Sequence, residues 1–295
     1  MPSYTLTECL DRFMKDSRHH ASSTSQRNNG AVKNLNTFFN GLYLNGQFRV
    51  IDGAEISRYR EWRKTVPLPP RNTVATPQTI KRELAVASAA INYCRSELNW
   101  DIPNPITGRM MSRQDKRAET KRKRFMTPSE EAAVLLASPP ILRDIVQFAL
   151  LTGFRQGEIL SLTWERIIGD VVIFTPEDQK SRRFGKRVLS PDALAIVDRQ
   201  PEGHSLVFHQ DGQKIRKETL NRWWRKAKKL AGVDDIRFHD TRGTAGQKML
   251  NAGASIEGVS AQFGHGDVRT TQSYYVDPSL ERARDAVNRI AVRGP

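Results

Sequence analysis

Apolar residues recur at three- and four-residue spacings through roughly the first hundred positions, a pattern that predicts amphipathic helices. Two of these helices begin at recognisable caps, because Asp52 stands three residues before Glu55 and Thr76 precedes Pro77. We therefore predict a bundle of four short helices. Its inward-facing residues are Leu6, Leu10, Phe13 and Met14, then Val32, Leu35, Phe39 and Leu42, then Ile56, Tyr59 and Trp62, and finally Ile80, Leu84, Ala87, Ile91 and Cys94.

The pattern changes in the second half of the chain. Thr127–Glu130 has the spacing of a capping box with proline at the first helical position, and a further helix is expected over Ile141–Leu151. The β-rich runs Val171–Phe174 and Arg187–Leu189 predict a hairpin, and Leu206–Phe208 predicts another short strand. Helical patterns fill most of the remainder. The predicted fold class is mainly α with a small β-sheet, the second domain being of the α+β type.

Charge narrows the function. Lys and Arg outnumber Asp and Glu by 47 to 32, which gives a net charge of +15 and a pI near 10.1. An excess of this size favours a polyanionic partner such as nucleic acid over a surface that is basic only for solubility. A basic helix over 215–230 should turn Leu220, Trp223 or Trp224, Ala227 and Leu230 inward. It should present Arg222 and Arg225 to DNA phosphates.

Residues 109–125 hold eight basic and two acidic residues and lack an apolar pattern. We read them as a linker between a domain over 1–108 and a second domain over 126–295. A solvated tether has the same composition, but in so basic a chain the linker is expected to follow the DNA backbone. Its candidate DNA-binding residues are Lys121, Arg122, Lys123 and Arg124.

Cys9 and Cys94 are too few for a disulfide framework or a zinc site and read as buried thiols in a reducing compartment. No apolar stretch approaches the roughly 20 residues that span a bilayer, and the N-terminus has no signal-peptide pattern. We therefore expect a cytoplasmic protein without a membrane partner.

Residues suited to phosphate chemistry occur in four short segments. Arg155 follows an apolar helix in Thr152–Glu158, where Gly153 permits a sharp turn and Glu158 can orient neighbouring side chains. His239 and Arg242 are three positions apart, so a helix starting there places both on one face. Either segment alone is also typical of ordinary surface residues.

His265 ends the apolar run Ile256–Phe263, and a helix C-terminus is expected to raise its affinity for a proton. Alone, it reads as a histidine that terminates a helix. Tyr274 and Tyr275 follow. A free phenol, with a pKa of about 10, is a poor nucleophile at neutral pH unless positive charge stabilises the phenolate.

Together these segments resemble the tyrosine recombinase (phage integrase) family. The resemblance is carried by 152–158, 238–245, 263–265 and 270–274, and more loosely by the helix over 79–94 with Asn104-Pro105. Many members have leucine at Thr241 and histidine at Gly243, differences that affect packing more than chemistry. The resemblance implies a helical core-binding (SAM-like) domain followed by an α+β catalytic domain.

For the site, the resemblance implies that Tyr274, rather than Tyr275, attacks DNA and forms a 3′-phosphotyrosyl bond without metal, ATP or cofactor. Arg155 and Arg242 would bind the phosphate, with His265 as a further donor and His239 as the base. Glu158 would support them. The family's hairpin lysine, the acid, would be Lys180, with Lys186 as the alternative.

For partners, the resemblance implies duplex recombination sites, a homotetramer on synapsed DNA, and accessory DNA-bending or excisionase proteins. The stripe Leu280, Ala283, Val287 and Ile290 would dock on a neighbouring protomer or on its own domain. We expect no arm-binding domain ahead of the core-binding helices. The open alternatives to an integrase are a Xer-like resolvase, a type IB topoisomerase and a DNA-binding protein without catalysis. The target sequence cannot be predicted.

Overall fold

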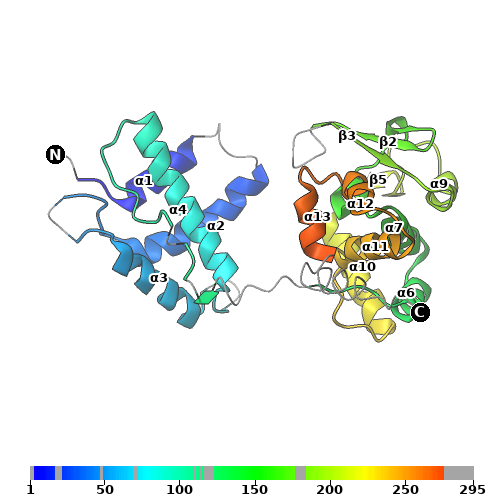
Figure 1. The fold of residues 1–295 in the computed structure, drawn as a ribbon, viewed down its shortest axis with the longest axis horizontal. Coiled ribbons are helices and arrows are strands. Elements are labelled where there is room, and N and C mark those ends of the chain that lie inside the picture. The colour runs from blue at the N-terminus through cyan, green and yellow to red at the C-terminus, as the bar shows by residue number, and fades with distance from the viewer. Residues whose placement is uncertain are drawn as a thin grey trace, which may run out of the picture. The chain divides into compact units, whose positions relative to one another are not determined.

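The computed structural model describes residues 3–16, 22–46, 49–68, 72–108, 110–112, 114–115, 123–176 and 184–275. The chain divides into two compact units, Met1–Thr120 and Lys121–Pro295, each with its own hydrophobic core (Figure 1). The predicted linker, 109–125, lies partly outside the described residues, and its boundaries stay a prediction.

Helices form the first unit, as the apolar periodicity predicts. Thr76 caps the last of them through its hydroxyl, with Pro77 in the first turn, and Asp52 caps the third through a carboxylate that accepts from the Ala54 and Glu55 amides at 2.8 Å each. The apolar faces of the helices bury Leu10, Leu35 and Ile91, among others, to less than 1% exposure. The helices are α1 (Leu6–Lys15), α2 (Ser22–Phe39), α3 (Gly53–Thr65) and α4 (Pro77–Glu97).

A buried polar network joins α2, α3 and α4. The Glu83 carboxylate accepts from Arg63 at 2.9 and 2.8 Å, from the Tyr59 hydroxyl at 2.7 Å and from the Asn34 amide at 2.8 Å. Arg63 and Glu83 are each only 4% exposed. These contacts satisfy a carboxylate that would otherwise be costly to bury.

The second unit combines helices with two small sheets (Figure 1). Its helices are α6 (Pro128–Ala137), α7 (Pro140–Thr152), α8 (Gln156–Leu160), the 3-10 turn η2 (Trp164–Arg166), α9 (Pro191–Asp198), α10 (Lys217–Leu230), α11 (Asp240–Asn251), α12 (Ile256–Phe263) and α13 (Val268–Tyr275). Its strands are β1 (Ile167–Ile168), β2 (Val171–Phe174), β3 (Gly185–Val188), β4 (His209–Gln210) and β5 (Gln213–Lys214). The fold class, mainly α with small sheets, is therefore as predicted.

The packing of this unit positions its chemistry. The predicted hairpin is present, with β2 antiparallel to β3 and Val172 opposite Arg187. Helix α11 packs against α7, and α12 packs against both α13 and β3. Segments that are far apart in the sequence therefore converge around the ends of α7 and α12.

Two predictions about this unit are wrong. Leu206–Phe208 does not extend into a strand, because its pairing is limited to one antiparallel bridge, between Leu206 and Thr163. The short hairpin lies further on, over β4 and β5, around a turn in which Asp211 and Gly212 both have positive φ. Leu230 is 67% exposed, because α10 ends there and its inward positions are already taken by Leu220, Trp224 and Ala227.

Candidate active site

Arg155 stands where the chain turns from α7 into α8. Gly153 ends α7 in the left-handed conformation, with φ +69°, as the sequence predicts. The buried Glu158 carboxylate accepts from the Arg155 backbone N–H and from its Nη1, both at 2.7 Å. The Arg155 side chain remains 39% exposed. A carboxylate within the fold thus orients a guanidinium that reaches the surface.

Arg242 joins the ends of three segments. Its Nη1 donates to the Gly153 carbonyl at 2.6 Å, its Nη2 donates to the Phe263 carbonyl at 2.7 Å, and its guanidinium carbon lies 4.1 Å from the centre of the Phe263 ring. The residue is 6% exposed. Burial, and then the charge of Arg155, lower the pKa of Arg242 from its ordinary value. The site therefore concentrates positive charge that is only partly balanced.

His265 follows Gly264, which ends α12. Its Nε2 lies 3.1 Å from Arg242 Nη2, and its Nδ1 lies 2.7 Å from the Thr271 hydroxyl. Because a guanidinium can only donate, Nε2 accepts, and the ring proton sits on Nδ1, which donates to Thr271. Thr271 is fully buried on α13. His265 therefore ties the helix that carries Tyr274 to Arg242.

The predicted rise in the proton affinity of His265 is wrong. Burial, followed by the charges of Arg242, Arg155 and Arg187, lowers its pKa to about 4. A helix C-terminus contributes only a fraction of a charge, whereas three guanidinium groups act from other segments. His265 is consequently neutral at physiological pH.

His239 is the N-cap residue of α11, and its side chain is exposed. Desolvation by the surrounding protein atoms, followed by the charge of Arg242, lowers the pKa of His239. It too is a neutral imidazole near pH 7 and can accept a proton.

Tyr274 lies on α13 and lines a pocket of about 290 Å³ with His239, Arg242 and His265. A Cβ atom at Gly243 would lie 2.9 Å from the Tyr274 hydroxyl, so the phenol rests against the first turn of α11. The structure thus brings four of the predicted site residues to one cavity, with Arg155 acting on Arg242 and both histidines through its charge.

Tyr275 lines the same pocket, but its contacts differ from those of Tyr274. Its hydroxyl donates to the Gly243 carbonyl at 3.2 Å, and its ring stacks on Phe125 with centroids 6.0 Å apart. Burial raises the pKa of Tyr275 well above that of a free phenol. These contacts favour a packing role for Tyr275 and leave Tyr274 as the candidate nucleophile.

Of the two hairpin lysines, the structure describes only Lys186, which does not line this cavity. Lys180 lies outside the described residues. Lys186 is on the exposed face of β3, and the next residue, Arg187, faces inward and is 3% exposed. Sequence reasoning missed Arg187. The signal available was the strand alternation, since Leu189 is apolar and shares a face with residue 187.

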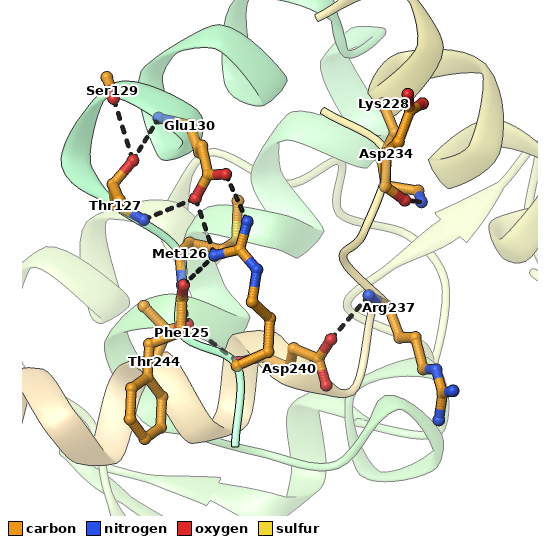
Figure 2. A network of polar contacts seen from close by, with 11 residues as sticks. Phe125, Met126, Thr127, Ser129, Glu130, Lys228, Asp234, Arg237, Asp240 and Thr244 are labelled. Atoms are coloured by element: carbon orange, nitrogen blue, oxygen red, sulfur yellow. Dashed lines mark hydrogen bonds and ion pairs between the residues drawn. The ribbon is translucent and has the colours of Figure 1, made fainter. Parts of the chain in front are cut away.

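The basic residues at the start of the second unit differ in their contacts. Lys121 and Arg122 lie outside the described residues, and Lys123 is exposed. Arg124 instead pairs with Glu130 and lowers the pKa of that carboxyl to about 2. Figure 2 shows Glu130 in the reciprocal capping contacts with Thr127, beside Met126.

Of the remaining DNA-binding candidates, Arg222 and Arg225 lie on the exposed face of α10. Within the described ranges, no cluster of His, Cys, Asp and Glu side chains could hold a metal ion. None of the helices described is both long and apolar enough to cross a bilayer.

Residues 123–281 match the model of the phage integrase family. The chain belongs to this family. It is 30% identical to the integrase of Salmonella phage P22 over 171 residues, which cover 53% of this chain and 44% of that protein. It is 26% identical to the shufflon-specific DNA recombinase of Escherichia coli over 278 residues, which cover 92% of this chain and 68% of that protein. The chain thus spans less than half the length of the phage P22 relative.

Solved structures of the phage integrase family share the fold. A lambda integrase dimer bound to a COC′ core site has a TM-score of 0.72 at 20% identity, over 93% of this chain and 78% of that one. A lambda integrase tetramer bound to a Holliday junction has a TM-score of 0.69 at 19% identity, over 90% of this chain and 78% of that one. The predicted family and fold are both confirmed.

Proposed function

We propose that this phage integrase family member is a site-specific DNA recombinase that cleaves and rejoins DNA through a covalent bond to Tyr274. The observation that carries the proposal is the single cavity that Tyr274 shares with Arg242, His239 and His265. Membership of the family supports it, since the phage P22 and Escherichia coli relatives are an integrase and a recombinase.

The proposed step is a transesterification at phosphorus. The Tyr274 oxygen forms a bond to the scissile phosphorus, the bond from phosphorus to the 5′ oxygen breaks, and a 3′-phosphotyrosyl link and a free 5′ hydroxyl result. His239 takes the phenolic proton, since its imidazole is neutral, and a lysine returns a proton to the leaving oxygen. The 5′ hydroxyl of a partner strand then attacks the link and restores a phosphodiester, so bond energy is conserved.

Arg155 and Arg242 supply the charge that this step needs. The phosphodiester carries one negative charge, and the five-coordinate transition state carries two. Guanidinium groups donate hydrogen bonds in a planar fork and stay charged, so they suit this oxyanion. Glu158 is a supporting group that fixes Arg155. His265 adds a hydrogen bond, and its protonation state decides whether its Nε2 donates or accepts.

For the acid we propose Lys180. Lys186 is disfavoured because its side chain lies on the exposed face of β3, opposite the face that carries Arg187 against Gly264. We further propose duplex recombination sites as substrate and a homotetramer on synapsed DNA as the active assembly. Lys121, Arg122, Lys123, Arg222 and Arg225 would contact phosphates, whereas Arg124 is engaged with Glu130.

The test is covalent trapping. A nicked suicide duplex, which loses the short 5′ fragment after cleavage, should accumulate a protein–DNA adduct with the wild type and none with Tyr274→Phe. Tyr275→Phe is the matched control and should still form the adduct. An adduct with Tyr274→Phe that is absent with Tyr275→Phe would refute the assignment. Strand exchange between two labelled duplexes then separates a recombinase from a topoisomerase-like activity.

A further inference from the structure

Arg187 is a buried cation on β3 that the scheme above does not use. It is 3% exposed, and its guanidinium carbon lies 5.6 Å from the centre of the Phe174 ring on β2. Its Nη1 donates to the Lys186 carbonyl at 2.8 Å. The side chain therefore crosses the inner face of the hairpin and does not reach solvent.

The other side of this guanidinium meets the turn before His265. A Cβ atom at Gly264 would lie 1.6 Å from Arg187 Nη2, so only glycine leaves room for the contact, and the φ of +60° at Gly264 favours glycine as well. The register of this contact is fixed nearby, because the Gln262 amide accepts from the Val188 N–H at 3.1 Å and donates to the Val188 carbonyl at 2.9 Å. Arg187 thus lies wedged between the hairpin and the His265 turn.

Two of the three guanidinium nitrogens of Arg187, the buried Nε and Nη2, lack a hydrogen-bond acceptor among the described residues. Burial lowers the pKa of Arg187, the Glu158 carboxylate opposes this, and the charge of Arg155 adds a smaller lowering effect. Burying a cation whose Nε and Nη2 lack acceptors among the described residues costs free energy, which is a reason to look for a role of Arg187 in the site.

The charges around the site indicate what the role of Arg187 is. The Glu158 carboxylate interacts with Arg155, Arg187 and Arg242, so one negative charge faces three positive charges. Among these four groups an excess of two positive charges remains while both histidines are neutral, and Asp240 and Arg237, which also line the cavity, add one charge of each sign. A phosphodiester whose charge rises from one to two in the transition state would offset that excess.

We propose that Arg187 is a positioning residue of the phosphate site, which holds the Gly264–His265 turn in place and supplies a permanent charge that the scissile phosphate offsets. The inference rests on the proposed function. It assigns to Arg187 opposite effects on the two states: the residue destabilises the free protein and accelerates cleavage of DNA. An arginine that only supports the fold would stabilise the free protein.

The variants for the test are Arg187→Met, which keeps the length and removes the charge, and Arg187→Lys, which keeps the charge and removes the planar fork. Arg199→Met is the matched control, because it removes the same charge from an exposed position on the same unit, where Arg199 pairs with Asp144. The readouts are the melting temperature of the DNA-free protein and the rate of adduct formation on the suicide duplex. The rate is measured with an ordinary scissile diester and with a neutral methylphosphonate in its place.

Arg187→Met should melt at the same temperature as the wild type or higher. It should cleave the diester slower by a factor on the order of 10². On the uncharged methylphosphonate this defect should shrink at least about tenfold, since less negative charge needs to be offset. Arg187→Lys should fall between Arg187→Met and the wild type, and Arg199→Met should cleave both substrates at the wild-type rate.

Three results would overturn the inference: a lower melting temperature or misfolding of Arg187→Met, an unchanged cleavage rate, or equal defects on the two substrates. In each case the wild type still forms its adduct and the proposed function stands. If the wild type forms no adduct on a substrate that it binds, the proposed function fails and this inference fails with it.

Discussion

Because His265 is neutral in the folded protein, the stability of the second unit should depend on pH in a predictable direction. Its pKa is 6.5 as an ordinary histidine and about 4 in the folded protein. As the pH falls below 6.5, His265 becomes protonated in the unfolded chain. In the folded protein it stays neutral until the pH approaches about 4. The stability contributed by the neutral ring is therefore complete above that ordinary value and is lost as the pH falls through this window.

The magnitude follows from these two pKa values. Between pH 7.5 and pH 5, proton binding to the unfolded chain alone lowers the free energy of unfolding by about 2 kcal/mol. The change to make is His265→Gln, because the glutamine amide can accept from Arg242 and donate to Thr271 as the imidazole does, without titrating. The wild type should therefore lose about 2 kcal/mol more than His265→Gln over this range.

The measurement is calorimetric unfolding of both proteins across the pH series, following the transition that the substitution shifts. Titration of the imidazole nitrogens by ¹⁵N NMR reports the pKa and the tautomer directly. A difference in unfolding free energy that stays constant from pH 7.5 to pH 5 would refute the reasoning, as would a protonated Nε2 in the free protein at neutral pH.

Three further changes test the packing. Tyr275→Phe should cost about 1 kcal/mol in chemical unfolding, because the hydroxyl loses its bond to a carbonyl of α11. Gly264→Ala should lower the unfolding free energy, measured by calorimetry, by at least about 2 kcal/mol. The added methyl group would overlap Arg187, and alanine is strained in the left-handed backbone conformation of this position. Glu83→Leu should cost about 3–5 kcal/mol by leaving Arg63 buried and unpaired, and the double variant with Arg63→Met should cost less. A double variant as unstable as the single one would contradict this.

Features that depend on neighbouring residues were predictable from the sequence. Helix periodicity and local caps located α4 and α6, where Thr76 and Thr127 accept from amides within the same turn. The left-handed turn at Gly153 is local as well. The resemblance to the phage integrase family brought His239, Arg242 and Tyr274 into consideration together, although only the fold places them around one cavity.

Features that depend on distant segments were not predictable. The pKa of His265 was expected to rise because the helix terminus is the only effect visible nearby in the sequence. Its pKa is instead lowered by burial and then by the charges of Arg242 on α11, Arg155 at the N-cap of α8 and Arg187 on β3. Arg187 was overlooked because an arginine on a strand is ordinarily exposed, and its burial against Gly264 joins residues 77 positions apart. Leu206–Phe208 has the composition of a strand, but it pairs with residues 162–164 through one bridge only, and a partner that far away in the sequence is not visible locally.

We predict that binding of a phosphate at this site is coupled to the uptake of a proton. Arg242 Nη2 donates both to the Phe263 carbonyl and to His265 Nε2, and only the contact to His265 is with a group that can change its proton count. A bound phosphate oxygen would compete for that donor and, being negative, favour a protonated His265 that donates in turn. Binding of a duplex containing the site should therefore take up protons near pH 6, which calorimetric titration in buffers of different ionisation enthalpy would detect. The uptake should be smaller in His265→Gln. Equal uptake by the variant and the wild type would mean that His265 stays neutral on DNA and is held only as an acceptor for Arg242.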